Sequence, residues 1–132
     1  MARYLLDADV VIDWLLGFPS SVALVKDLHE RGESLCTSAV VVAEIHSGVR
    51  PAEAGVADAF LESCTYLPAG YEDARQAGRW RHEFAQRGIA LSTTDMLVAA
   101  TALSHQATIV TGNVKDYPME EVTVLPLPRP RR

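Results

Sequence analysis

The sequence is poor in the residues that support thiol, zinc or nucleophile chemistry. It has only two cysteines among 132 residues, without CxxC spacing, and four histidines that form no metal-ligand pattern. Cys36 and Cys64 are therefore expected to be small buried hydrophobic residues. No Ser-His-Asp or Cys-His pairing is recognisable in the sequence, so it offers no candidate for catalysis through a side-chain nucleophile.

Long apolar runs and excess basic charge are also absent. The apolar N-terminal stretch is interrupted at Asp7, Asp9 and Asp13 before it reaches the length of a signal or membrane-spanning segment, which predicts a cytoplasmic protein without a membrane partner. The net charge of -5 argues against a domain that holds nucleic acid by a basic face alone. It does not exclude a nuclease, because bound metal ions would offset acidic charge locally.

What remains is the composition of one folded domain. Apolar residues make up 48% and charged residues 22% of the chain, as in ordinary globular proteins. A chain of this length buries roughly 68% of its unfolded surface. We predict a single domain over residues 1–125, without repeats or linkers. Residues 126–132 (PLPRPRR) cannot pair inside a sheet and are predicted to form a loose basic tail.

Short apolar strands alternate with longer helical segments, which predicts an α/β fold with a mainly parallel sheet. The expected strands are residues 3–6, 34–37, 65–67, 108–111 and 122–125. The expected helices are residues 9–16, a helix capped by Ser20 or Ser21 and stopped at Gly32, a helix from Ser38 to about Gly48, residues 51–63, residues 72–87, and a helix capped by Thr93 or Thr94.

Four acidic residues lie in or beside apolar stretches, where an ionised group is costly: Asp7, Glu44, Asp95 and Asp116. No run of Lys or Arg is placed to neutralise all of them. The predicted elements bring them to one edge of the sheet, outside the carboxyl ends of its strands, where open α/β sheets bind ligands. A hard divalent cation with oxygen ligands is the simplest common partner.

Taken singly, three of these acids also have ordinary structural explanations. Asp95 could complement a helix N-terminus, Asp116 could be a turn residue, and Asp7 could cap a helix, although Asp9 suits that role better. Glu44 is the hardest to explain in this way, because it interrupts the apolar run of residues 40–45 (VVVAEI). The joint spacing of the four acids therefore carries more weight than any one of them.

The four acids lie in four short segments, which are residues 5–11 (LLDADVV), 43–49 (AEIHSGV), 94–102 (TDMLVAATA) and 110–117 (VTGNVKDY). These segments resemble the signatures of PIN-domain ribonucleases, and most closely those of the VapC toxins of type II toxin–antitoxin modules. The resemblance covers about residues 3–125 and implies a three-layer α/β/α fold. It implies Asp7, Glu44, Asp95 and Asp116 as the catalytic, metal-binding residues. Thr111 and Asn113 match a Thr-x-Asn element that supports the site or positions substrate.

The same resemblance implies an Mg²⁺-dependent endoribonuclease, with Mn²⁺ as a substitute, that cleaves RNA such as tRNA or rRNA. It further implies a homodimer and a small VapB-type antitoxin whose C-terminal segment occupies the active-site groove. Two residues depart from the family pattern. Asp9 stands where Ser, Thr or Asn is commoner, and its added charge could join the site or cap the helix; we favour the cap. Gly112 replaces a bulkier, often basic residue, which would weaken phosphate contact or loosen the loop.

Two other classes of protein share parts of this pattern. In a haloacid-dehalogenase-like phosphatase, Asp7 would be a covalent phosphoryl acceptor, but Glu44 and Asp95 would have no role. A receiver-like signalling module suits the length and the βα alternation, but the sequence lacks a mid-chain strand that ends in an acceptor aspartate. Trapping an acyl-phosphate would distinguish both from a hydrolase that forms none.

Overall fold

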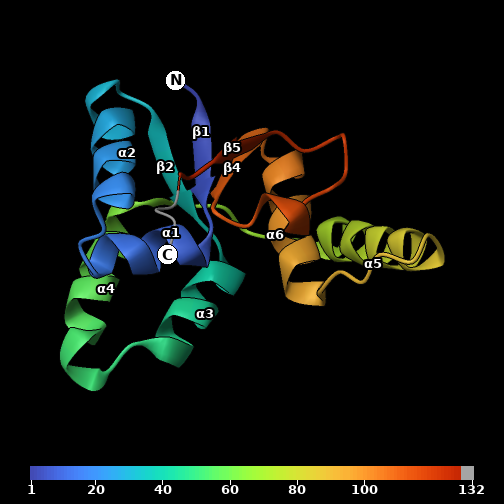
Figure 1. Cartoon of the computed structure of the whole chain (residues 1–132), viewed down its shortest axis with the longest axis horizontal. Helices are drawn as coiled ribbons and strands as arrows, with labels where there is room; N and C mark the ends of the chain where they lie inside the picture. The colour runs from blue at the N-terminus through green and yellow to red at the C-terminus, as the bar shows by residue number, and fades with distance from the viewer. Residues whose placement is uncertain (129–132) are drawn as a thin grey trace.

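A five-stranded parallel sheet forms the middle of the molecule (Figure 1). The structure is a computed structural model and describes residues 1–128. The strands are β1 (Arg3–Leu6), β2 (Ser34–Thr37), β3 (Thr65–Tyr66), β4 (Ala107–Thr111) and β5 (Val124–Pro126). Their order is β3-β2-β1-β4-β5, so the direction of winding reverses between β1 and β4. A ligand site is therefore expected where these two strands end.

Helices cover both faces of the sheet. They are α1 (Ala8–Leu15), α2 (Pro19–Glu30), α3 (Ala39–Gly48), α4 (Ala54–Ser63), α5 (Tyr71–Gln86) and α6 (Thr93–Ser104), with short 3-10 turns η1 (Pro51–Glu53) and η2 (Val114–Asp116). In Figure 1, α2 and α4 lie to one side of the strands, and α5 and α6 to the other. The predicted three-layer α/β/α arrangement is thus confirmed.

Helix α6 is buried along most of its length, because it packs against both β4 and α5. Its buried residues are small or apolar for the most part and are Met96, Val98, Ala99, Ala100, Thr101 and Ala102. Strands β1 and β4 are similarly apolar, as expected of a parallel sheet covered on both faces. The first turn of α6, which carries Asp95, is therefore held in place by a rigid core.

The start of α2 differs from the sequence prediction. Neither Ser20 nor Ser21 caps it, because the helix begins at Pro19 without a side-chain cap. Ser21 is instead completely buried and donates a hydrogen bond to the carbonyl of Val10, 2.6 Å away. The serine thus fastens α2 to α1, and proline at the first helical position supplies the helix start.

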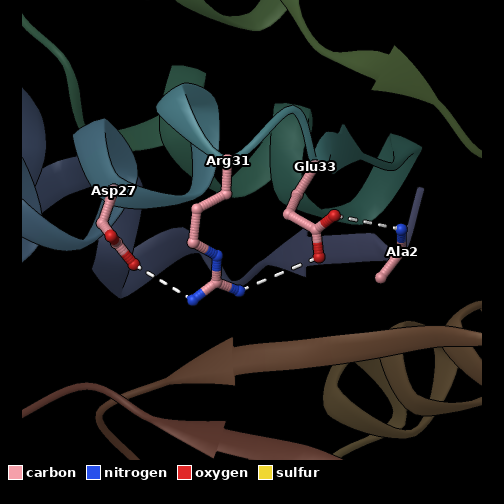
Figure 2. A network of polar contacts seen from close by, with 4 residues as sticks. All are labelled: Ala2, Asp27, Arg31 and Glu33. Atoms are coloured by element: carbon pink, nitrogen blue, oxygen red, sulfur yellow. Dashed lines mark hydrogen bonds and ion pairs between the residues drawn. The ribbon is translucent and has the colours of Figure 1, made fainter.

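A polar network lies at the amino ends of β1 and β2 (Figure 2). The acidic residues Asp7 and Asp116 follow the carboxyl ends of β1 and β4, at the other end of the strands. Arg31 lies 3.2 Å from Asp27 and 3.8 Å from Glu33, and the Ala2 N–H donates to Glu33 at 3.4 Å. Arg31 and Asp27 are largely exposed, so this pair stabilises the fold by only about 0–1 kcal/mol, whereas the Glu33 side chain is mostly buried. The network defines the α2–β2 turn without bearing on the acidic residues.

The ordered chain extends past the predicted domain end. Pro126 is the last residue of β5, on the edge of the sheet, where a proline needs no ladder donor. The next residue, Leu127, is buried and donates its N–H to the Thr111 carbonyl at 2.7 Å. The predicted loose tail from Pro126 therefore does not apply to these two residues. Its Arg-rich part, 129–132, lies outside the described residues.

The two cysteines behave as the sequence suggests. Cys36 is fully buried in β2, and Cys64 is partly buried after α4. Burial raises the pKa of the Cys64 thiol to about 11, so the reactive thiolate is scarce at neutral pH.

Within residues 1–128, no single helix is long and apolar enough to cross a membrane. Helices α1 and α2 together have the length and composition of a span, but they form a pair bent by 106°.

Candidate active site

Asp7 is the first residue after β1 and lies among hydrogen-bond donors. Its Oδ1 accepts the N–H of Ala8 at 2.9 Å, which makes Asp7 the N-cap of α1. Its Oδ2 accepts the hydroxyls of Thr111 at 3.0 Å and Tyr117 at 2.8 Å. A backbone hydrogen bond from the Asp7 N–H to the Val110 carbonyl also joins the end of β1 to β4. Asp7 thus lies where β1 and β4 end side by side.

Asp9 is not the helix cap that the sequence predicted, because Asp7 takes that role. Asp9 lies in the first turn of α1, and its Oδ2 accepts the Gly112 N–H at 2.8 Å and the Asn113 side-chain amide at 3.2 Å. The loop after β4 is thus bonded to α1 at Gly112, the position at which the sequence suggested a looser loop.

Glu44 points an oxygen into a buried position without a partner. It lies on α3, which Ser38 caps through the Val41 N–H as predicted, and which packs against α1 and α6. The Glu44 Oε1 is buried and finds no hydrogen-bond partner among residues 1–128. An unsatisfied buried acceptor costs about 1–3 kcal/mol. Such an atom needs an explanation beyond the fold, and a cation supplies one.

Asp95 is placed by a different cap from the one predicted. Ser92, rather than Thr93 or Thr94, is the N-cap of α6, and its hydroxyl accepts the Asp95 N–H at 3.1 Å. Asp95 is therefore the third residue of the helix, on the turn that the core holds in place. In Figure 1, β1 runs downward from the N-terminus, and below its end lie α1, which carries Asp9, and α3, which carries Glu44.

Asp116 ends the short turn η2 in the loop that follows β4. Within this loop the Asn113 N–H donates to the Thr111 hydroxyl at 3.0 Å, and the Asp116 N–H donates to the Asn113 carbonyl at 3.0 Å. Asp116 is partly exposed and Tyr117 is buried. The loop therefore carries one acid at the surface and anchors the next residue beneath it.

Mutual repulsion links the four predicted acids. Burial, and then the charges of Asp7 and Asp95, raise the pKa of Glu44. Burial also raises the pKa of Asp95, with a further contribution from Asp116 that a Ser92 hydrogen bond opposes. For Asp7, burial raises the pKa, and the charge of Asp9 adds to it against the hydrogen bonds from the two hydroxyls. The charges of the four acids therefore act on one another, and the charge of Asp9 contributes to all three raised pKa values.

This group has no cationic partner in the described chain. Among residues 1–128, none of the four acids forms an ion pair. Nor do three His, Cys, Asp or Glu side chains of this part of the chain lie close enough together to hold a metal ion as they stand. Like charges repel, so we expect the carboxylates to draw together only around a cation.

Comparison with known proteins decides the family. The sequence-family model that describes the PIN domain matches residues 4–118, which is most of the chain. The chain belongs to the PIN-domain family. It is 30% identical over 115 residues to ribonuclease VapC19 of Mycobacterium tuberculosis, covering 87% of this chain and 92% of that protein.

Solved structures share the fold of this PIN domain. VapBC2 from Rickettsia felis, bound to a promoter DNA fragment, matches with a TM-score of 0.79 at 22% identity, covering 94% of this chain and 98% of that one. DNA-bound VapBC from Salmonella typhimurium matches with a TM-score of 0.81 at 20% identity, covering 96% and 99%. The family assignment sets aside the phosphatase and receiver alternatives.

Tyr117 is a residue of the PIN domain's acidic site that sequence reasoning missed. Its hydroxyl donates to the same Asp7 oxygen that Thr111 contacts. Burial raises the pKa of Tyr117, and the charge of Asp7 raises it further, so the hydroxyl keeps its proton and stays a donor. The only sequence signal was its place beside Asp116, because the contact with Asp7 spans 110 positions.

Proposed function

We propose that this PIN domain is a metal-dependent endoribonuclease, the VapC-type toxin of a toxin–antitoxin pair. The observation that carries the proposal is the buried, unpartnered Oε1 of Glu44 within a coupled group of acids at the ends of β1 and β4. The curated relative VapC19 is itself a ribonuclease. RNA, with tRNA or rRNA as the expected class, is the proposed substrate.

The donor set fits a hard cation. Asp7, Glu44, Asp95 and Asp116 would hold it through oxygen atoms alone, as Mg²⁺ prefers, and Mn²⁺ would substitute. Once bound, Mg²⁺ would polarise the scissile phosphate and lower the pKa of an attacking water. A cation beside Glu44 would also compensate its orphaned oxygen and the repulsion among the acids.

The remaining residues of the site orient these carboxylates. The Thr111 hydroxyl donates to Asp7 Oδ2 and accepts the Asn113 N–H, so it joins the first acid to the loop that carries Asp116. Tyr117 holds the same Asp7 oxygen from beneath the loop. This supports Thr111 and Asn113 as positioning residues, and hydrolysis by water requires no side-chain nucleophile.

The test of the function is RNA cleavage by the purified protein. Cleavage should occur with Mg²⁺, stop when EDTA removes the metal, and return with excess Mg²⁺ or with Mn²⁺. Mapping the 5′ ends of cellular RNA after induction would then identify the target. Undiminished cleavage in EDTA would refute the metal-dependent mechanism.

Tyr117→Phe is expected to weaken Mg²⁺ binding by about 10-fold, at the low end of the 10–100-fold effect of removing a partner of a metal ligand. The ring still fills its buried position, but Asp7 Oδ2 loses one of its two hydroxyl donors. Isothermal titration with Mg²⁺ measures the change. Tyr66→Phe, at an exposed tyrosine on β3, is the matched control. Equal affinity in both variants would show that Tyr117 only fills space.

We further propose that a second antitoxin segment, distinct from the C-terminal one expected in the active-site groove, binds an apolar groove away from the acids. The groove has a volume of about 460 Å³ between α1, α2, α4 and β2, and its rim carries Lys26 and His29. Val22 and Val56, both in the groove lining, are exposed by 38% and 59%. The fold neighbours are VapBC complexes, which supports a protein partner of this kind. The predicted homodimer stays a prediction.

Val22→Asp should weaken antitoxin binding at least about tenfold, because burying a valine is worth about 1.5–3 kcal/mol, whereas RNA cleavage should be unchanged. Titration of the VapB-type antitoxin by calorimetry measures the affinity. Leu103→Asp on α6, also 38% exposed, is the control. Unchanged affinity for Val22→Asp would place the antitoxin elsewhere.

A further inference from the structure

The charge at position 9 meets the loop after β4 directly. Asp9 Oδ2 accepts two hydrogen bonds, one from the Gly112 N–H at 2.8 Å and one from the Asn113 side-chain amide at 3.2 Å. Hydrogen bonds to an ionised oxygen are roughly twice as strong as neutral ones. These contacts join the first turn of α1 to residues more than 100 positions away.

Packing contributes little to holding this loop. Asn113, Val114 and Lys115 are all exposed, with Val114 exposed by 42%. The Asn113 carbonyl accepts the Asp116 N–H, so the position of Asn113 sets the start of the η2 turn that ends in Asp116. A segment with few apolar contacts is locally unstable, so its geometry depends on its hydrogen bonds.

We infer that Asp9 is a positioning residue, whose carboxylate holds the 112–116 loop so that Asp116 is presented to the other acids. This inference rests on the proposed nuclease function for its catalytic consequence. Asp9 then acts through Asn113 and Gly112 and does not serve as a fifth metal ligand. What matters at position 9 is an oxygen acceptor that reaches the loop, which Asn also offers and Ala does not.

The test compares Asp9→Ala with Asp9→Asn in the full chain. In the metal-free protein without RNA, hydrogen exchange at the Gly112 and Asn113 amides should accelerate in Asp9→Ala and return towards the wild-type rate in Asp9→Asn. In the cleavage assay, Asp9→Ala should lower kcat by about 10–100-fold, and Asp9→Asn should recover most of that loss. Mg²⁺ affinity should fall less in Asp9→Asn than in Asp7→Asn.

Two results would overturn the inference. One is unchanged loop exchange in Asp9→Ala. The other is an equal, deep loss of Mg²⁺ affinity in Asp9→Asn and Asp9→Ala, which would make Asp9 a ligand. Asn113→Ala tests the contact from the loop side: it should accelerate the same exchange, and adding Asp9→Ala should change little more. If wild type cleaves no RNA, the proposed function fails, but the exchange rates still decide the role of Asp9.

Discussion

Asp7→Asn is expected to abolish RNA cleavage while the protein stays folded. The amide keeps the shape of the side chain but loses the charge that a hard cation requires of its ligand. It also offers one acceptor oxygen where Asp7 uses two, so it cannot both cap α1 and accept the Thr111 and Tyr117 hydroxyls. The loss should exceed the about 10–100-fold typical of a residue that only supports a ligand.

Folding should survive because two effects of this substitution oppose each other. Each hydrogen bond that the single Asn oxygen cannot accept costs about 0.5–1.5 kcal/mol, whereas removal of a buried charge relieves the desolvation that raises the pKa of Asp7. Circular dichroism melts check the fold, and cleavage rates check the site. Asp27→Asn, at an exposed aspartate of α2 in the network of Figure 2, is the control. Wild-type cleavage by Asp7→Asn would remove this residue from the active site.

The sequence predicts the elements around the site better than their exact ends. The first two strands were predicted at their observed bounds, because their apolar residues are flanked by clear turn and cap residues. The caps of α1 and α6 were each misplaced, by two residues at Asp9 and by one or two at Thr93 or Thr94. Several neighbouring Asp, Ser and Thr side chains could each cap a helix, and local sequence does not rank them.

The contacts that orient the candidate site could not be predicted in the same way. The adjacency of β1 and β4 follows from the strand order, which local patterns do not encode. Only that adjacency brings Tyr117 to Asp7 and Gly112 to Asp9. The apolar surroundings of the acids predict a common site, and the structure places them near enough for their charges to act on one another. Their assignment as metal ligands stays a prediction that substitution must test.

In the metal-free protein, the contribution of the acidic residues to the free energy of unfolding should be larger near pH 5 than near pH 7. The pKa values of Asp7, Glu44 and Asp95 are all raised above their ordinary values of 3.8, 4.5 and 3.8. The folded state therefore binds these protons more tightly than the unfolded state. The resulting stability is complete below about pH 4 and is lost as the pH rises through the folded-state values.

Mg²⁺ should reverse this trend, because it favours the ionised carboxylates. At ten times its dissociation constant, it should stabilise the wild type by about 1.4 kcal/mol at pH 7 through mass action, and by less at pH 5, where protons compete. Asp95→Asn should raise the stability of the metal-free protein, flatten its pH dependence and remove most of the gain from Mg²⁺. Thermal melts at both pH values, in EDTA and in Mg²⁺, measure all of these effects.

The same melts distinguish a metal centre from a purely structural aspartate. If Asp95 only complements the N-terminus of α6 behind its Ser92 cap, replacing it by Asn would remove a favourable charge–dipole interaction of about 0.3–1 kcal/mol. The variant would then be slightly less stable than the wild type, and Mg²⁺ would affect neither protein. A coupled acidic centre requires the opposite sign in EDTA, because relief of repulsion from Asp116 and of burial outweighs the dipole contribution. The sign of the stability change in EDTA thus decides whether the acids act as one group.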